Sequence, residues 1–255
     1  MTYFEHKSAA ERYARSRPSF HPLVMQRIRD ALPLHHPVSR ALDVGCGTGQ
    51  STIALQDLAQ EIVGTDLSSE MLSVAPRKSG VHYVRASAEG LPFAAEAFDL
   101  ITVALAFHWF DRTQFLTEAR RVLGPSAWLV IYDNGFAGEM RENRQFAEWS
   151  RTSYLRRYPS PPRDRRPLAE AEAAAHGFRF EGRERYANDV GFSLDELVDY
   201  LMTQSNVIAA VEGGAERAED VRAWLKGALA PLFVTPKGTF QFGGPITYLQ
   251  KHGSA

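Results

Sequence analysis

The sequence predicts an α/β protein with a doubly wound, mainly parallel sheet of seven strands, helices on both faces and an added helical cap. Three observations carry this prediction: a series of short apolar runs, helix-like segments between them, and a glycine-rich turn after the first run. Strands that are apolar throughout and alternate with helices are typical of a parallel sheet that is covered on both faces. The last two strands and the cap are assigned to the C-terminal part.

The apolar runs and the helical patterns alternate from residue 40 onward. The runs predict strands at 42–44, 61–66, 81–86, 98–104 and 127–132, followed by 178–186 and 239–250. Apolar spacing of three and four residues predicts the helices, at 9–15, 23–32, 50–60, 69–78, 168–176 and 216–230, with further helices after the caps Asp111 and Ser193. Residues 136–158 are expected to be helical in part.

Two signals mark element ends. Ser8 with Glu11, and Ser193 with Glu196, have the spacing of a capping box at a helix start. The proline-rich segment 160–167 (SPPRDRRP) predicts an exposed loop, and its arginines read as solvated. We expect three parts: 1–36 with N-terminal helices covering a cofactor site, 37–135 as the cofactor-binding core, and 136–255 with substrate-covering helices and the last two strands.

Composition predicts an ordinary globule of 255 residues with 44% hydrophobic and 23% charged residues. A net charge of −1 provides no field for nucleic acid or an anionic membrane, so neither is expected as a partner. No apolar run reaches the length of a membrane span, and a cytoplasmic monomer or homodimer is the default expectation. The single cysteine excludes an internal disulfide. No metal is expected, and His35-His36 reads as linker.

The turn ALDVGCGTGQ separates a buried strand from a helix start. Gly45, Gly47 and Gly49 allow positive φ and let the backbone lie against a ligand. A dinucleotide fingerprint needs a sixth-position glycine, which is Gln50 here. The preceding carboxylate, Asp43, would repel a pyrophosphate but suits a ligand that carries an ammonium group. This favours a zwitterionic nucleotide over NAD.

The second strand ends in Asp66, which fits a carboxylate that accepts both hydroxyls of a ribose. With ALDVGCGTGQST, GTDLSSEML, RASAEGLPF, FDLITVALAFHWFD and ARRVLGPSAWLVIY in this order, the chain resembles the class I S-adenosylmethionine-dependent methyltransferases. It is most similar to small-molecule members, the trans-aconitate and ubiquinone/menaquinone methyltransferase-like groups. The motifs cover Tyr13 to Tyr132, and AERYARSRPSF resembles the entry segment of the first group.

The resemblance implies S-adenosyl-L-methionine as cofactor and S-adenosyl-L-homocysteine as product. It implies that the methionine end is held by Asp43 and the loop backbone, with the Ala104 carbonyl near the amine and Tyr13 and Arg17 near the carboxylate. The loop residues concerned are Gly45, Cys46, Gly47 and Gly49. The Cys46 side chain reads as a small filler in preference to a reactive thiol.

The resemblance also implies the adenosine contacts. Asp66 would hold the ribose, and Leu67 and Met71 would flank the adenine. The adenine edge would be read at Ser87-Ala88-Glu89. Aspartate is frequent in the family where Ser87 stands, so the bond to the adenine amino group would be weaker or would come from Glu89.

The acceptor is left open by the sequence. His108 follows the fourth strand and is the candidate general base, with positioning or cofactor contact as alternatives. Trp109 reads as a packed aromatic lid in preference to a substrate contact. If Arg156, Arg157 or Arg166 points inward, a carboxylate acceptor is expected; if all face solvent, an apolar or phenolic one is expected.

The predicted function is methyl transfer to a small-molecule acceptor, with carboxylate or hydroxyl oxygen favoured over carbon. Two alternatives remain at this stage. One is a cofactor-binding regulatory or scaffold protein without transferase activity. The other is a nicotinamide-dependent oxidoreductase, which the residue Gln50 argues against.

Overall fold

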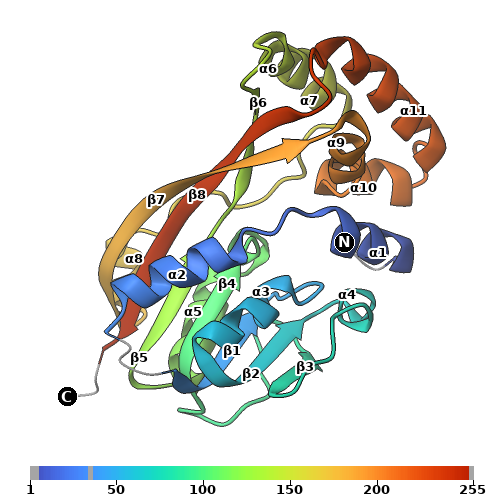
Figure 1. The fold of residues 1–255 in the computed structure, drawn as a ribbon. Helices are drawn as coiled ribbons and strands as arrows, with labels where there is room; N and C mark the ends of the chain where they lie inside the picture. Colours follow the sequence, from blue (N-terminus) through green and yellow to red (C-terminus); the bar gives the residue numbers. More distant parts are fainter. Residues whose placement is uncertain (1–5, 34–36, 253–255) are drawn as a thin grey trace. The chain divides into compact units, whose positions relative to one another are not determined.

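The computed structural model describes residues 6–33 and 37–252, and within them one eight-stranded sheet (Figure 1). Its order is β3-β2-β1-β4-β5-β8-β6, and β7 pairs with β8. The pairs among β1 to β5 are parallel, whereas β8 runs antiparallel to β5 and β6. The strands are β1 (Val38–Val44), β2 (Ala59–Asp66), β3 (Val81–Arg85), β4 (Phe98–Ala104), β5 (Leu123–Tyr132), β6 (Gly135–Met140), β7 (Phe178–Phe192) and β8 (Gly238–Lys251).

The predicted fold class, a Rossmann-like and mainly parallel α/β sheet, is confirmed, but the strand count is wrong. Residues 136–158 are helical in part, as expected, at 145–157, whereas Gly135–Met140 forms the strand β6 that was not predicted. Its backbone pairs with β8 at Gly135↔Gly243 and Phe136↔Phe242. The eighth strand therefore arises from a long-range pairing that local sequence pattern does not encode.

The helices are mostly shorter than their sequence patterns indicate. Those expected over 50–60 and 69–78 end at Ala54 and Ser73, and α10 was not expected at all. The α-helices are α1 (Lys7–Ser16), α2 (His21–Ala31), α3 (Gln50–Ala54), α4 (Ser69–Ser73), α5 (Arg112–Val122), α6 (Gln145–Trp149), α7 (Leu155–Arg157), α8 (Glu170–Ala175), α9 (Leu194–Leu201), α10 (Ser205–Glu212) and α11 (Ala218–Leu229). Short 3₁₀ turns lie at η1 (Leu55–Asp57), η2 (Phe107–Trp109) and η4 (Ala230–Leu232), and a π-helical turn at η3 (Ser150–Tyr154).

The predicted caps have mixed outcomes. Ser193 and Glu196 form the complete capping box of α9, and the Asp111 side chain accepts from the Gln114 N–H at the start of α5. The expected Ser8 cap is wrong, because α1 begins at Lys7 and its cap residue makes no side-chain bond. Side-chain capping therefore fixes the starts of α5 and α9 but not that of α1.

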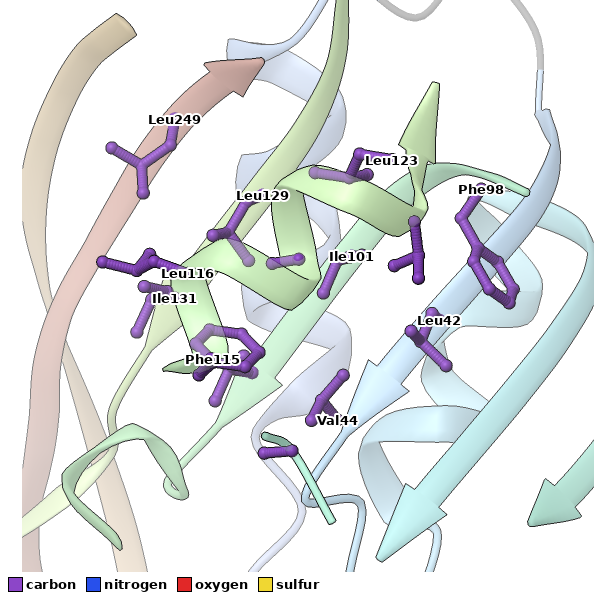
Figure 2. Close-up of a cluster of buried hydrophobic side chains, with 14 of the residues drawn as sticks. Leu42, Val44, Phe98, Ile101, Phe115, Leu116, Leu123, Leu129, Ile131 and Leu249 are labelled. Atoms are coloured by element: carbon purple, nitrogen blue, oxygen red, sulfur yellow. The ribbon is translucent and has the colours of Figure 1, made fainter. Parts of the chain in front are cut away.

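Alternate side chains of the central strands enter two cores, one on each face of the sheet. Leu42, Ile101 and Leu129 lie in the first core, whereas the neighbouring Ala41 and Leu100 lie in the second. This two-residue period follows from the pleat of a strand. Figure 2 shows the first core, in which side chains of α5 pack against β1, β4 and β5. Helix α2 packs into the second core, so helices on both faces are confirmed.

Close contacts divide the chain into two units built from separated segments. The sheet unit comprises Ser19–Asp133, Arg163–Tyr186 and Pro245–Ala255, and the helical unit comprises Met1–Pro18, Asn134–Pro162 and Ala187–Gly244. These units do not follow the predicted boundaries at 36 and 135. The difference arises because α2 belongs to the sheet core, and because β7 and β8 each contribute residues to both units.

The helical unit has a core of its own, rich in aromatic side chains. Phe192 stacks on Tyr200 at 5.5 Å between ring centroids, and Trp149 stacks on Tyr154 at 5.7 Å and on Trp224 at 6.1 Å. Stacked and tilted aromatic pairs add stabilisation beyond the area they bury. The helical part that the sequence predicts is therefore a packed unit, and its role as a cover for the cofactor site remains a prediction.

Candidate functional site: the glycine loop and the carboxyl ends of the strands

The loop after β1 is built on three left-handed glycines. Gly45, Gly47 and Gly49 have φ of 70°, 54° and 78°. The N–H groups of Gly45 and Cys46 both donate to the Thr65 carbonyl of β2, at 2.8 and 2.9 Å. These bonds fold the loop back over the ends of β1 and β2, and side chains other than glycine rarely adopt such φ values. The positive φ predicted for the loop is confirmed.

Each loop glycine also lies against a neighbouring side chain. A Cβ atom added at Gly45 would lie 2.5 Å from Cβ of Ala106, and one at Gly47 would lie 3.1 Å from Cε of Met71. At Gly49 it would meet the Tyr83 hydroxyl. The loop is therefore packed closely against the sheet unit on several sides, and its conformation is strongly determined.

Asp43 is fully buried beneath this loop. Its carboxylate accepts hydrogen bonds from the hydroxyls of Ser51 at 2.6 Å, Thr52 at 2.8 Å and Thr102 at 3.0 Å. Burial raises the pKa of Asp43 to about 6, with Asp66 adding to the rise and the three hydroxyls opposing it. The structure thus joins the Asp43 carboxylate to the start of α3 and to β4, and its predicted contact with the methionine end of a cofactor stays a prediction.

Asp66, at the end of β2, holds the same loop from the other side. Its Oδ2 accepts from the Gly47 N–H and its Oδ1 from the Ser68 N–H, both at 2.8 Å. Burial raises the pKa of Asp66, and these backbone bonds oppose the rise. Asp66 therefore fixes the tip of the loop while its carboxylate stays partly exposed at the carboxyl end of the strand.

The Cys46 thiol is buried in this loop. Burial raises its pKa well above the usual thiol value, and Asp43 and Asp66 add to the rise. Because the thiolate is the nucleophilic form of cysteine, this environment keeps the side chain inert. The reading of Cys46 as a small filler is the one that its environment supports.

The segment after Asp66 presents one exposed and one buried apolar side chain. Leu67 is 49% exposed and Met71 is buried. The Ser68 side chain accepts from the Met71 N–H at 3.1 Å and so fixes the start of α4. The two residues predicted to flank the adenine therefore lie within one turn of each other, beside the glycine loop.

The segment Ser87-Ala88-Glu89, predicted to contact the adenine edge, is held in place by the Glu89 carboxylate. The Ser87 hydroxyl donates to Oε2 of Glu89, and Oε1 of Glu89 accepts from the Asp111 N–H at 2.9 Å. Ala88 is buried between them in sequence. Glu89 thereby joins this segment to the start of α5, and both oxygens of its carboxylate already have a protein donor.

Ala104 ends β4, where the chain turns sharply. Ala104 is paired with Tyr132 of β5, and the N–H of the following Leu105 donates to the Tyr132 carbonyl at 3.0 Å. Leu105 has a φ of 56°, which is uncommon for a residue with a branched side chain. The turn leads directly into η2, which carries His108.

His108 is bonded to a guanidinium group rather than to a carboxylate. Nη1 of Arg163 donates to its Nε2 at 3.1 Å, so Nε2 accepts and any ring proton lies on Nδ1. Burial, with smaller contributions from Arg163 and Arg165, lowers the pKa of His108 to about 4. A general base at neutral pH needs an available lone pair and a pKa near 7. This environment provides neither, which counts against the predicted role of His108 as a base.

Arg163 is a residue that the sequence interpretation missed. Its guanidinium carbon lies 4.6 Å from the ring centroid of Trp109, and it bonds to His108. Trp109 itself is 38% exposed. The expected solvated loop is therefore wrong for Arg163, because an arginine can stack on an aromatic face while it donates from its edge. The dipeptide His108-Trp109, with a polar and a stacking side chain together, is the signal that could have pointed to such a partner.

Tyr13 and Arg17 belong to the helical unit. Nη2 of Arg17 donates to the Thr203 carbonyl at 2.8 Å, and its guanidinium lies over the rings of Tyr13 and Tyr200 at 4.4 and 5.3 Å. Both residues are thus part of the packing between α1 and α9. Their predicted contact with the methionine carboxylate remains a prediction.

The described residues contain no group of three or more His, Cys, Asp or Glu that could hold a metal ion. His35 and His36 lie outside them. Within the same residues, none of the helices has the length and apolar character required to cross a bilayer.

A family model described as "Methyltransferase domain" matches residues 42–131, the segment that carries the glycine loop, Asp66 and His108. Residues 42–131 therefore resemble a methyltransferase domain. A demethylmenaquinone methyltransferase of Deinococcus radiodurans is 38% identical to it over 116 residues, 42% of this chain and 48% of that protein. An uncharacterized methyltransferase of Mycobacterium tuberculosis is 32% identical over 165 residues, 64% of this chain and 63% of that protein.

Solved structures share the fold of this chain. A structure from Anaeromyxobacter dehalogenans, described as a type II methyltransferase, superposes with a TM-score of 0.69 at 24% identity and covers 92% of this chain and 97% of its own. Among curated relatives the match is shorter: it spans 47% of one from Dictyostelium discoideum and 48% of the one from Deinococcus radiodurans.

Proposed function

We propose that this chain transfers a methyl group from S-adenosyl-L-methionine to a small-molecule acceptor, with oxygen favoured over carbon. The observation that carries the proposal is the glycine loop fixed by Asp66, inside the segment that matches a methyltransferase domain. The relative from Deinococcus radiodurans is named for demethylmenaquinone, which supports an acceptor that is neither protein nor nucleic acid.

The residues at the carboxyl ends of β1, β2 and β4 fit such a cofactor. Gly45 and Gly47 leave the loop backbone without side chains, and a Cβ at either position would meet a neighbouring protein side chain. The carboxylate of Asp66 suits ribose hydroxyls, and Leu67 offers an exposed apolar surface for a base. We propose the remaining contacts as the resemblance implies them, with Tyr13 and Arg17 at the methionine carboxylate and Asp43 at the methionine end. The others are Cys46, Gly49, Met71, Ser87, Ala88, Glu89 and Ala104.

When bound, this cofactor supplies an activated methyl group on a sulfonium. The protein's part is then to align the acceptor with the methyl group, which can contribute roughly 7–11 kcal/mol of a reaction barrier. Aromatic side chains near the reacting atoms, such as Phe107 and Trp109, would exclude water and favour a cation.

The arginines favour one class of oxygen acceptor. Arg156, Arg157 and Arg166 are all exposed, and Arg157 and Arg166 pair with Glu216 and Asp164. None of the three arginines therefore points inward, where it could bind a substrate carboxylate. We therefore favour an apolar or phenolic hydroxyl over a carboxylate. A cytoplasmic monomer or homodimer with no nucleic-acid or membrane partner remains the prediction from composition.

The proposal is tested by calorimetry with S-adenosyl-L-homocysteine and NAD, comparing the parent with Asp66→Ala. We expect the parent to bind S-adenosyl-L-homocysteine and not NAD. Loss of hydrogen bonds to a charged group should weaken binding in Asp66→Ala by about 1.5–3 kcal/mol, which is roughly 10- to 150-fold.

Asp57→Ala is the matched control, because Asp57 is an exposed aspartate of the same unit. It should bind as the parent does. Unchanged affinity in Asp66→Ala would remove Asp66 from the site, and NAD binding by the parent would favour an oxidoreductase. Binding without methyl transfer to any metabolite of a broad library would favour a regulatory or scaffold protein.

A further inference from the structure

Asp133 follows β5 at the carboxyl edge of the sheet, directly after the Ala104↔Tyr132 pair. Its backbone is held on both sides: its N–H donates to the Pro245 carbonyl at 3.1 Å, and its carbonyl accepts from the Tyr186 hydroxyl at 2.9 Å. Ligands of open α/β sheets bind at this edge. Asp133 is therefore a rigidly placed acid on the side of the sheet where the glycine loop lies.

Three groups act electrostatically on the Asp133 carboxyl: two guanidinium groups and a phenol. Burial raises its pKa, whereas Arg165 and Arg163 oppose the rise. Tyr186 is the third group, and the negative charge of Asp133 adds to the burial that raises the Tyr186 pKa. A partly buried carboxylate beside two guanidinium groups can stay charged at neutral pH and still take up a proton when a substrate delivers one.

The other polar groups at this edge are already engaged. His108 is a weak base whose Nε2 accepts from Arg163. Both oxygens of Glu89 accept from protein donors. The Tyr186 hydroxyl donates to a backbone carbonyl, and its raised pKa keeps it protonated. These interactions occupy His108, Glu89 and Tyr186. Among the described residues that we compare at this edge, Asp133 is the acid that remains for a proton transfer.

Arg163 is delivered to this place by an anchored segment. Nη1 of Arg112 donates to the Arg166 carbonyl at 3.0 Å and lies 3.3 Å from Oδ2 of Asp164, while its Nη2 lies 2.9 Å from Oε2 of Glu172. The Arg112 side chain is itself buried. Because the segment is fixed at its centre, the neighbouring Arg163 is held against the His108-Trp109 pair.

We propose that Asp133 accepts the proton from the hydroxyl of the methyl acceptor, and that Arg163 keeps this carboxylate charged beforehand. The inference rests on the proposed function. In the step, the acceptor oxygen forms a bond to the methyl carbon, and its proton moves to the Asp133 carboxylate. The electron pair of the broken sulfur–methyl bond stays on sulfur. The charges balance, since a sulfonium and a carboxylate become a thioether and a carboxylic acid.

The first test needs no acceptor. Carboxyl ¹³C NMR of the full chain, labelled at aspartate, gives the pKa of Asp133, with Asp133→Asn identifying its resonance. We expect this pKa to lie above the ordinary aspartate value and to rise further in Arg163→Gln, because an opposing cation is removed. An ordinary value in the parent, or one that does not move in Arg163→Gln, would overturn the proposal.

The second test measures transfer of labelled methyl groups from S-adenosyl-L-methionine to phenol, catechol and 4-hydroxybenzoate, with benzoate as the acid control. For the phenol that is methylated, Asp133→Asn should lower kcat by about 10²- to 10⁴-fold. The acid limb of the kcat pH profile should disappear as well. Affinity for S-adenosyl-L-homocysteine should stay within about twofold of the parent, and Asp57→Asn should behave as the parent does.

The outcomes separate this inference from the proposed function. A parent that does not bind S-adenosyl-L-homocysteine contradicts the proposed function itself. A parent that binds it, yet methylates benzoate alone or none of the three phenols, overturns the role of Asp133. The same holds if Asp133→Asn keeps the parent's kcat and pH profile.

Discussion

The loop after β1 requires glycine, because its backbone conformation and close packing leave no room for a Cβ atom. Gly45 lies against Ala106, and its φ of 70° would be costly for any other residue. By contrast Gly90 has open space around its Cβ position and an ordinary φ. Glycine is therefore required at residue 45 but not at residue 90.

We expect Gly45→Ala to lower the free energy of unfolding by at least about 1–2 kcal/mol, the cost of a left-handed residue, with the contact to Ala106 adding to it. Binding of S-adenosyl-L-homocysteine should weaken in parallel. Urea unfolding and calorimetry measure the two effects. Gly90→Ala is the control and should change neither. Equal behaviour of the two variants would show that the loop tolerates a Cβ at residue 45.

At this scale the sequence predicted residue types better than residue roles. The placement of Asp43, Asp66 and the glycines followed from one motif, because backbone geometry there depends on neighbours in sequence. The hydroxyl partners of Asp43 come from α3 and β4, and the partner of His108 comes from 55 residues away. Such long-range partners set burial and pKa, and a single sequence does not reveal them.

Among the elements, the segment 163–166 shows the largest difference from expectation. It has no regular secondary structure, as its prolines predict, yet Arg112 of α5 fixes it. Composition alone predicts solvation for such a run, since exposed arginines among prolines are common. The strand 98–104, in contrast, was predicted to the residue because its apolar run is bounded on both sides.

Arg112→Ala should lower the free energy of unfolding by about 1.5–3 kcal/mol, because hydrogen bonds to charged partners are lost. The released segment should also allow the pKa of His108 to rise from about 4 toward 6.5. Thermal unfolding and ¹H–¹⁵N NMR of the imidazole measure the two effects. Arg77→Ala removes an exposed arginine of the sheet unit and should alter neither. A His108 pKa that stays near 4 in Arg112→Ala would contradict the anchoring role.

Helix α11 offers a prediction in the helical unit. Gly227 lies exposed near its C-terminal end, with no atom within 4 Å of the Cβ position. Gly227→Ala should raise the free energy of unfolding by about 0.5–1 kcal/mol, because alanine loses less backbone entropy in a helix. Urea unfolding measures the change.

Gly214→Ala is the matched control for Gly227→Ala. Gly214 also has open space, but its φ is 75°. The same substitution there should destabilise the protein. A stabilisation at both positions would show that backbone conformation does not decide the sign.

For the whole molecule, the sequence predicted the layered α/β class but not the division of the chain. The class follows from the alternation of apolar strands with helices, which is a local pattern along the sequence. The units follow from contacts between segments more than a hundred residues apart, such as β5 with β8. The eighth strand has the same origin, since Gly135–Met140 becomes a strand only through its pairing with β8.

The free energy of unfolding depends on pH through two buried groups, His108 and Asp43, whose pKa values shift in opposite directions. The pKa of His108 falls from 6.5 in the unfolded chain to about 4, so the unfolded state takes up a proton first as pH falls. The free energy of unfolding therefore decreases as pH falls from 6.5 to 4, because protonation of His108 favours the unfolded state. The pKa of Asp43 rises from 3.8 to about 6, so stability is lost as pH rises from 3.8 to 6.

These signs predict opposite slopes for two variants measured against the parent. Between pH 6.5 and 4, the parent should lose stability relative to His108→Gln, because only the parent carries the imidazole. Between pH 3.8 and 6, the parent should lose stability relative to Asp43→Asn as pH rises. Urea unfolding at half-unit pH steps gives both differences, and the other titrating groups cancel in each comparison. Parallel pH curves for the parent and His108→Gln would show that the imidazole titrates normally in the folded protein, contrary to its bond with Arg163.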